Sequence, residues 1–147
     1  MKHIDTVYPK NPSHCNCLNV RRASRAVTEF YDKVLKPGGL TVAQLGLLWS
    51  LKRAEADTIG GLAGLMRIDR TTLNRNLKPL ADAGLLTVSP GRDSRTRQVA
   101  LTEDGREAVA RGVALWLEAQ ASLKEYLGEE DLAKLTALLA KLEALVP

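Results

Sequence analysis

The sequence predicts a mainly α-helical fold that carries one small β-hairpin. Two observations lead to this expectation. Apolar residues recur with a helical period along most of the chain. Between the helical segments, the turn-forming residues 91–95 precede a short strand in which Val99 and Leu101 alternate with Gln98 and Ala100. We therefore expect a helical chain that is interrupted by a single hairpin.

Composition and charge are typical of one globular domain, or of one domain with extensions. The chain has 147 residues, of which 45% are hydrophobic and 26% charged, and its net charge is +4. Residues 67–97 hold seven Lys or Arg and three Asp, whereas residues 125–147 hold two Lys and five acidic residues. A local excess of positive charge is compatible with a nucleic-acid partner, although many basic proteins bind no nucleic acid.

Targeting and redox signals predict a cytoplasmic protein. No apolar run approaches the roughly 18–20 residues of a membrane span, and the N-terminus lacks the apolar region of a signal peptide. The two Cys are too few for a disulfide framework. We therefore expect a cytoplasmic location and no membrane partner.

The first two predicted helices follow an extended arm at residues 1–12. Ser13 is expected to cap a helix that runs to about Leu35, before the Pro-Gly-Gly of residues 37–39. Residues 41–44 read Thr-Val-Ala-Gln, a capping box that begins a second helix. The first of these helices is expected to carry, on one face, an apolar stripe made of Val20, Ala23, Val27, Phe30 or Tyr31, and Val34.

The third and fourth predicted helices are short and are joined by a tight turn. Thr58 is expected to cap the third, which three glycines weaken by up to about 1 kcal/mol each relative to Ala. Asp69 is expected to cap the fourth, over residues 70–83, with Gly84 after its end. Pro79 lies inside this helix and predicts a kink.

Two further helices follow the hairpin and complete the predicted organisation. Thr102 is expected to cap a long helix to about Leu127, and after Gly128 a last helix carries a leucine stripe up to Leu145. The predicted parts are an arm (1–12), a first dimerisation helix (13–40), a winged helix-turn-helix domain (41–102) and C-terminal dimerisation helices (103–147). A leucine stripe without a cover favours pairing of two copies about a two-fold axis.

Basic side chains gather on the fourth helix and on the hairpin. Singly, each is more often a solvated surface residue than a contact. Together they follow the order typical of a winged helix-turn-helix, in which the start of the second helix reaches base edges. The predicted DNA-binding residues are Arg67, Asp69, Arg70, Thr71, Thr72, Asn74, Arg75, Lys78, Arg92, Asp93, Ser94, Arg95 and Arg97.

Within this set, Thr72 and Arg75 are expected to read sequence. Thr72 is small enough to approach a base, and Arg75 is able to pair with guanine O6 and N7. The hairpin arginines suit phosphate contact or insertion into a narrow groove.

From about Asn16 to Leu145 the chain resembles the MarR family of winged-helix transcription regulators. The residues that carry the resemblance are Ile68–Arg75, Leu80–Leu86, Val99–Thr102, and the spacing Asp93-x-Arg95-x5-Leu101-Thr102-x2-Gly105. The resemblance implies a homodimer joined by the first and the last two helices, with recognition helices in successive major grooves and wings in the flanking minor grooves. It also implies that Arg95 enters the minor groove while Asp93 holds its guanidinium.

The histidines and cysteines, His3, His14, Cys15 and Cys17, all lie in the first 17 residues, and three interpretations stay open. The thiols are inert, or Cys17 is a redox sensor whose thiolate is favoured by the helix start and by Arg21, or His14, Cys15 and Cys17 bind a metal. In the peroxide-sensing branch of the family, two tyrosines activate such a cysteine. Tyr31 matches one of these tyrosines by its spacing from Cys17, and Arg21 occupies the position of the other tyrosine.

The function expected from the sequence is that of a homodimeric, sequence-specific regulator of transcription that binds a pseudo-palindromic operator in double-stranded DNA. We expect a repressor that a small-molecule effector releases, and neither enzymatic activity, nor a cofactor, nor a resident metal. The alternatives are a thiol-based redox regulator that uses Cys17, and a helical dimer that acts through protein contacts or a metal without binding DNA. The residues expected around the effector or redox site are Cys15, Cys17, Arg21, Arg22, Tyr31 and Trp49.

Overall fold

The computed structural model describes residues 3–4, 10–54, 56–93 and 95–147. Within them the chain is mainly helical and carries a small sheet, as predicted. The elements, in chain order, are α1 (Asn16–Leu35), the 3₁₀ helix η1 (Lys36–Gly38), α2 (Val42–Ala54), β1 (Ala56–Thr58), α3 (Ile59–Met66), α4 (Arg70–Asp82), β2 (Leu86–Pro90), β3 (Arg97–Leu101), α5 (Glu103–Leu127) and α6 (Glu129–Glu143).

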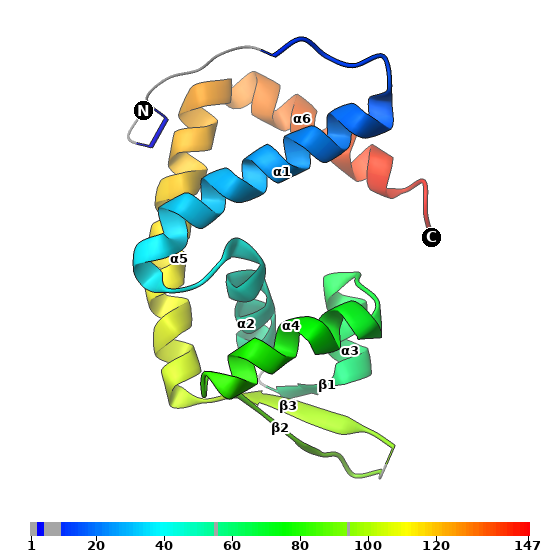
Figure 1. Cartoon of the computed structure of the whole chain (residues 1–147), viewed down its shortest axis with the longest axis vertical. Coiled ribbons are helices and arrows are strands. Elements are labelled where there is room, and N and C mark those ends of the chain that lie inside the picture. Colours follow the sequence, from blue (N-terminus) through cyan, green and yellow to red (C-terminus); the bar gives the residue numbers. More distant parts are fainter. Residues whose placement is uncertain (1–2, 5–9, 55, 94) are drawn as a thin grey trace.

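The long helix α5 connects the two ends of the molecule (Figure 1). At one end α1 crosses α5 and packs against it. At the other end lie α2, α3, α4 and the sheet, from which the hairpin projects away from the helices. The end that carries α1 therefore lies apart from the hairpin.

The sheet has three antiparallel strands in the order β1-β3-β2. The hairpin β2–β3 was predicted, and Val99 at its centre is fully buried. The strand β1 was not predicted, because three residues, Ala-Asp-Thr, are too few to show an alternating pattern. Its pairing, with Asp57 opposite Val99, ties the hairpin to the start of α3.

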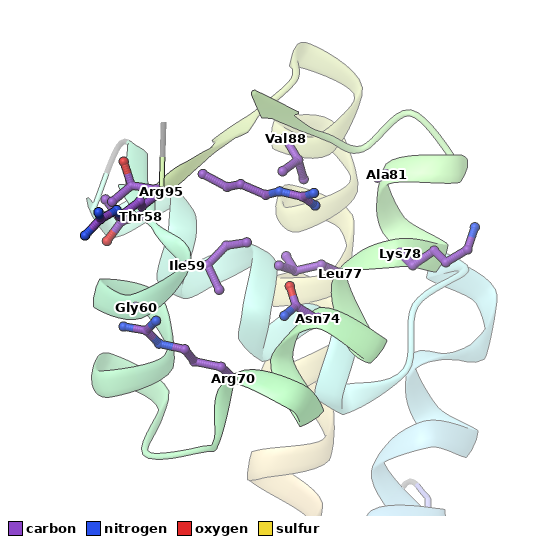
Figure 2. Close-up of a pocket in the computed structure, with 12 residues that line it drawn as sticks. Thr58, Ile59, Gly60, Arg70, Asn74, Leu77, Lys78, Ala81, Val88 and Arg95 are labelled. Carbon is purple, nitrogen blue, oxygen red and sulfur yellow. The ribbon is translucent and has the colours of Figure 1, made fainter. Parts of the chain in front are cut away.

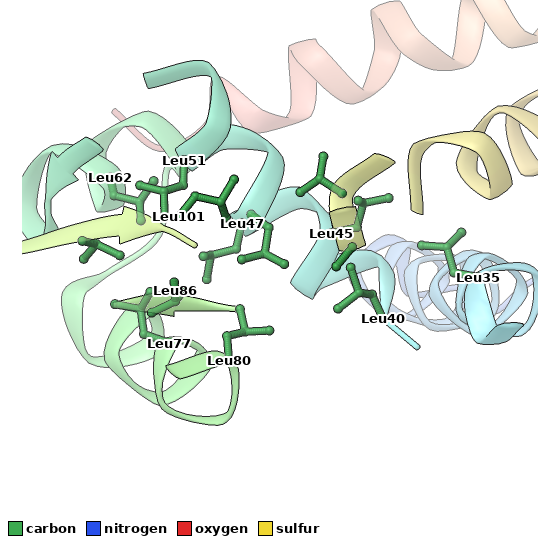
Figure 3. Close-up of a cluster of buried hydrophobic side chains, with 14 of the residues drawn as sticks. Leu35, Leu40, Leu45, Leu47, Leu51, Leu62, Leu77, Leu80, Leu86 and Leu101 are labelled. Carbon is green, nitrogen blue, oxygen red and sulfur yellow. The ribbon is translucent and has the colours of Figure 1, made fainter. Parts of the chain in front are cut away.

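A leucine-rich core joins α2, α3, α4 and the sheet (Figure 3). Each fully buried leucine contributes about 1.5–3 kcal/mol relative to an exposed one. Among the described residues, the largest fully buried side chains are Leu35, Leu45, Leu47, Leu48, Leu51, Leu62, Leu73, Leu80, Leu86, Val99 and Val109. The inward face predicted for α4, with Leu73, Leu77 and Leu80, is confirmed, and α4 continues through Pro79 to Asp82.

Four helices begin where the sequence predicted. Each has a capping oxygen that accepts from a main-chain N–H in the first turn: Thr41 from Gln44 (3.1 Å), Thr58 from Gly61 (3.0 Å), Asp69 from Thr72 (2.7 Å) and Thr102 from Gly105 (3.0 Å). The Gln44 side chain accepts in return from the N–H of Thr41, which completes the predicted capping box.

The predicted start of α1 was wrong by about two residues. Ser13 Oγ accepts from the N–H of Cys15, and the Asn19 side chain folds back onto the main chain of Ser13 at 2.8 and 2.9 Å. These local bonds hold the chain around a bend at His14, so Cys15 takes the N-cap position and the helix begins at Asn16. Of the predicted arm, His3 and Ile4 are half-buried, and His3 Nε2 lies 3.1 Å from Glu118 Oε2 on α5. The expectation of an extended arm also covers residues 1–2 and 5–9, which lie outside the described residues.

The apolar stripes of the terminal helices are largely exposed. In α1 only Tyr31, Val34 and Leu35 are buried within one chain, and Val20 and Val27 of the predicted stripe are exposed. No residue of α6 is buried, and Leu138 and Leu142 are 58% and 45% exposed. Exposed contiguous apolar surface of this kind marks an interaction site.

Gly105 is required where α5 begins beside the hairpin. A Cβ at this position would lie 2.0 Å from the main-chain oxygen of Leu85 and 2.8 Å from Leu101 Cδ1. The same turn is held by the Thr102 hydroxyl, which donates to the Gly84 oxygen at 2.7 Å. The glycine therefore permits the close approach of α5 to the base of β2.

We expect Gly105→Ala to lower the free energy of unfolding by about 1–3 kcal/mol, because a backbone oxygen must move to admit the methyl group. Gly46→Ala is the matched control: nothing lies within 4 Å of its Cβ position, so it should be neutral or stabilising by up to about 1 kcal/mol. Urea unfolding of both variants at one protein concentration measures the difference. Equal stabilities would contradict the close approach.

Asp69 is expected to make the free energy of unfolding depend on pH in the acidic range. The N–H and hydroxyl of Thr72 both donate to its carboxylate and hold the pKa of Asp69 below its ordinary value. Its contribution is therefore complete above the unfolded-state pKa and disappears as pH falls through the folded-state pKa. Asp69→Asn keeps a capping oxygen but does not titrate, so wild type should lose more stability than this variant on acidification below about pH 5. Parallel unfolding curves across that range would refute the expectation.

Candidate nucleic-acid interface

A hollow of about 660 Å³ lies between α4, the start of α3 and the hairpin (Figure 2). It brings together residues from α4, from the start of α3 and from both strands of the hairpin. Its lining residues are Thr58, Ile59, Gly60, Arg70, Asn74, Leu77, Lys78, Ala81, Val88, Arg95, Thr96 and Arg97. The hollow therefore has three walls, formed by α4, by the start of α3 and by the hairpin.

The lining of the hollow is positively charged. It includes the four basic side chains Arg70, Lys78, Arg95 and Arg97 and no acidic one. Arg70, Asn74 and Lys78 are spaced by four residues on α4 and form one face of this helix. An anionic, elongated ligand suits such a surface better than a compact apolar one.

The neighbouring face of α4 carries the residues that were expected to read sequence. Thr71 and Arg75 are exposed. Thr72 is half-buried, and its hydroxyl donates to Asp69 Oδ2 at 2.9 Å. Thr72 and Asp69 thus hold the start of the helix together, while Arg75 is left for contact with a ligand.

The hairpin tip is held by main-chain and short side-chain bonds. Gly91 N donates to Thr96 O at 2.8 Å, and both the N–H and the hydroxyl of Thr96 donate to Asp93 O at 3.0 Å. Asp93 Oδ1 accepts from the main-chain N–H of Arg95 at 3.1 Å. The family resemblance implied a bond to the Arg95 guanidinium, but this contact is to the Arg95 backbone and fixes the turn. Ser94 lies outside the described residues, while Arg92, Arg95 and Arg97 are exposed.

Arg67 lies outside the hollow. It has a left-handed backbone conformation (φ 55°) at the end of α3, and its Nη1 lies 2.6 Å from Glu143 Oε1 near the end of α6. Both side chains are largely exposed and screened by solvent, so this pair adds little to the stability of the fold. The predicted contact of Arg67 with DNA stays a prediction, and the structure gives this side chain a bond to the terminal helix.

The hollow also includes residues that sequence reasoning missed. Thr58, Ile59 and Gly60 form its α3 wall, and Thr96 belongs to its hairpin wall. The pairing of β1 with β3 brings this wall to the hairpin, and that pairing left no readable pattern. The only sequence signal for this wall is the glycine pair at residues 60–61, which by itself predicts only a helix of low stability.

The residues expected around an effector or redox site do not converge within one chain. Cys15 and Cys17 are exposed at the start of α1, and Tyr31, fourteen residues after Cys17, lies about 21 Å further along the helix. The Tyr31 hydroxyl donates to Gln120 Oε1, and burial raises the pKa of Tyr31. Trp49 packs edge-on against Trp116 with ring centroids 5.1 Å apart.

In the part of the chain that the structure describes, no group of three or more His, Cys, Asp or Glu is arranged to hold a metal ion. None of the described helices is both long and apolar enough to cross a membrane.

The comparisons with known proteins agree with this geometry. The model of the MarR family matches residues 38–96, which span the hollow. None of the curated proteins matches the sequence.

Solved structures match almost the whole chain. The transcriptional regulator MosR of M. tuberculosis, in complex with DNA, is 35% identical, with 88% of this chain and 93% of that chain covered and a TM-score of 0.79. A mutant MarR of E. coli complexed with operator DNA is 25% identical, with 84% and 89% covered and a TM-score of 0.75. BpsR of Bordetella bronchiseptica is 26% identical, with 93% and 99% covered and a TM-score of 0.80. The identity to MosR, its coverage and the shared winged helix show that this chain belongs to the MarR family of winged-helix transcription regulators.

Proposed function

We propose that the chain acts as a homodimer that binds a pseudo-palindromic operator in double-stranded DNA and represses transcription until an effector releases it. The observation that carries the proposal is the basic hollow between α4 and the hairpin. The structures of MosR with DNA and of MarR with operator DNA support the same partner here.

In this proposal α4 enters the major groove and the hairpin follows the backbone into the adjacent minor groove. Asn74 and Arg75 have the side chains that pair with adenine and guanine edges, and both are exposed on α4. Arg95 and Arg97 on the hairpin face phosphates or a narrow minor groove. The helix thus supplies specificity and the hairpin supplies affinity.

The dimer is proposed from the uncovered apolar surface of the terminal helices. The exposed large apolar side chains on α1, α5 and α6 are Val20, Val27, Leu117, Tyr126, Leu135, Leu138, Leu139 and Leu142, with Leu145 and Val146 beyond α6. A second copy of the chain would cover this apolar surface in both protomers. It would also bring a second basic hollow to the complex. Two hollows related by a two-fold axis fit two half-sites that lie one helical turn of DNA apart.

A small-molecule effector is the regulatory part of the proposal. The BpsR structure concerns regulation of its DNA binding by 6-hydroxynicotinic acid, which supports a small organic effector for this chain too. A second hollow, of about 630 Å³, lies between the end of α3 and the end of α6 and includes Arg67 and Glu143. It is large enough for such a molecule and lies between the winged domain and the terminal helices.

A thiol-based regulator is the second candidate, favoured by the exposure of both Cys15 and Cys17 at the start of α1. Peroxide would convert the two thiols into a disulfide with release of two waters. α1 starts at Asn16, between the two cysteines. A disulfide would therefore unwind the first turn of α1 and alter the proposed dimer interface, to which α1 belongs.

The DNA interface is tested by comparing two arginines. Arg95→Ala should weaken operator and random DNA alike and lower the salt dependence of binding by about one unit. Arg75→Ala should cost about 1–3 kcal/mol on the best operator and much less on random DNA. The control is Arg111→Ala. Arg111 is exposed on α5 and does not line the hollow, so its loss should change neither the affinity for DNA nor the salt dependence. Fluorescence anisotropy across a salt series measures all three, and a wild-type protein without affinity for any duplex would refute DNA binding.

The dimer seam is tested with two equally exposed leucines. Leu138 on α6 is 58% exposed and Leu65 on α3 is 57% exposed, so neither substitution removes core packing within one chain. Leu138→Glu would bury one charge from each protomer in the proposed dimer interface. It should therefore raise the dimer dissociation constant by at least about a hundredfold. Leu65→Glu should leave it unchanged. Sedimentation velocity reads both, and equal behaviour of the two variants would rule out α6 as the seam.

The thiol candidate predicts loss of operator binding after peroxide treatment and recovery with a reductant. Cys15→Ser and Cys17→Ser should both resist the oxidant, because the disulfide needs both sulfurs. Release of wild type and both variants to the same extent would exclude this disulfide, and retention of DNA by oxidised wild type would leave the small-molecule effector as the regulator.

A further inference from the structure

The three glycines of α3 face different surroundings. The helix has eight residues, so three glycines are a large fraction of it. Nothing lies within 4 Å of a Cβ at Gly64, whereas a Cβ at Gly61 would lie 2.2 Å from Asp57 Oδ1. At Gly60 the obstacle comes from the recognition helix: a Cβ there would lie 2.8 Å from Nη2 of Arg70.

The Arg70 guanidinium occupies the space that a side chain at Gly60 would take. Its Cζ and Nε would lie 3.4 and 3.7 Å from a Cβ at Gly60, so three atoms of the group cover this position. Figure 2 shows Arg70 reaching from the first turn of α4 to the first turn of α3. A methyl group at residue 60 would displace the guanidinium from this place.

This position puts Arg70 at the edge of the hollow. Arg70 and Gly60 both line it, while Asn74 and Lys78 line it further along the same face of α4. The guanidinium leans sideways onto α3. Thr71 and Arg75, which are four residues apart on α4, are also exposed. A charged group beside a helix in the major groove lies where the sugar-phosphate strand borders that groove.

We propose that Gly60 is a positioning residue that lets the Arg70 guanidinium lie over the first turn of α3, where it binds a phosphate of the operator backbone. The inference rests on the proposed DNA-binding function. The planar fork of a guanidinium matches two phosphate oxygens, and a fixed orientation reduces the entropy that binding costs. Arg70 therefore sets the register of the helix on the duplex and reads no base.

The experiment compares Gly60→Ala with Gly64→Ala, both in wild type and in an Arg70→Ala background. Both substitutions add a methyl group to the same helix and raise its propensity. Only Gly60→Ala meets Arg70, whose flexible end is able to move aside, so both variants should remain folded. Thermal unfolding and sedimentation check the fold and the oligomer, and anisotropy across a salt series measures DNA binding.

Arg70→Ala should weaken operator and random duplex equally, on the order of tenfold, and lower the salt slope by about one unit. Gly60→Ala should reproduce much of this loss, about three- to tenfold, whereas Gly64→Ala should leave affinity and slope unchanged. In the Arg70→Ala background, Gly60→Ala should have no further effect, because it acts through the guanidinium.

Three results would overturn the inference: wild-type affinity for Gly60→Ala, additive losses in the double variant, or a loss that Arg70→Ala shows on operator but not on random DNA. The last would mean that Arg70 reads a base. Each leaves DNA binding by wild type intact, whereas a wild type that binds no duplex refutes the proposed function and this inference with it.

Discussion

The antiparallel pairing of β3 with both β1 and β2 is the constraint on which the basic hollow depends. Thr58 is both the last residue of β1 and the cap of α3, so pairing of β1 with β3 fixes where α3 begins. At the other end of β3, Thr102 caps α5 and bonds back to Gly84. One central strand therefore positions the hairpin, the α3 wall and the long helix relative to one another, and Val99 anchors it in the core.

Sequence reasoning worked where a single local interaction decides the structure. The caps at Thr41, Thr58, Asp69 and Thr102 were predictable because a short polar side chain bonds a backbone amide three residues away. The start of α1 failed by the same logic: Ser13 is a good cap in isolation, but Asn19 folds back and holds it beside a bend at His14. A competing bond six residues away is not visible in a pattern of caps.

The walls of the hollow illustrate what lies beyond a one-dimensional pattern. The basic residues of α4 and the hairpin were predicted as a set, but their division into inner and outer faces needed the structure. Thr72 was expected to read bases, yet its hydroxyl bonds to Asp69. Gly60 looked like a defect in a short helix, and only the fold brings it to Arg70 from ten residues away.

The molecule has two uncovered surfaces of opposite character, and α5 joins them. The apolar surface on the terminal helices favours a second copy, while the basic hollow favours a polyanion. α5 is continuous from the hairpin to the terminal helices. A rotation of the terminal helices at the proposed dimer interface would therefore move the hollow as well. The ion pair between Arg67 and Glu143 adds a second link, from the end of α6 to the turn before α4. In the proposed homodimer, a ligand that changes the packing of the terminal helices would change the distance between the two hollows, and with it the ability to bind two operator half-sites at once.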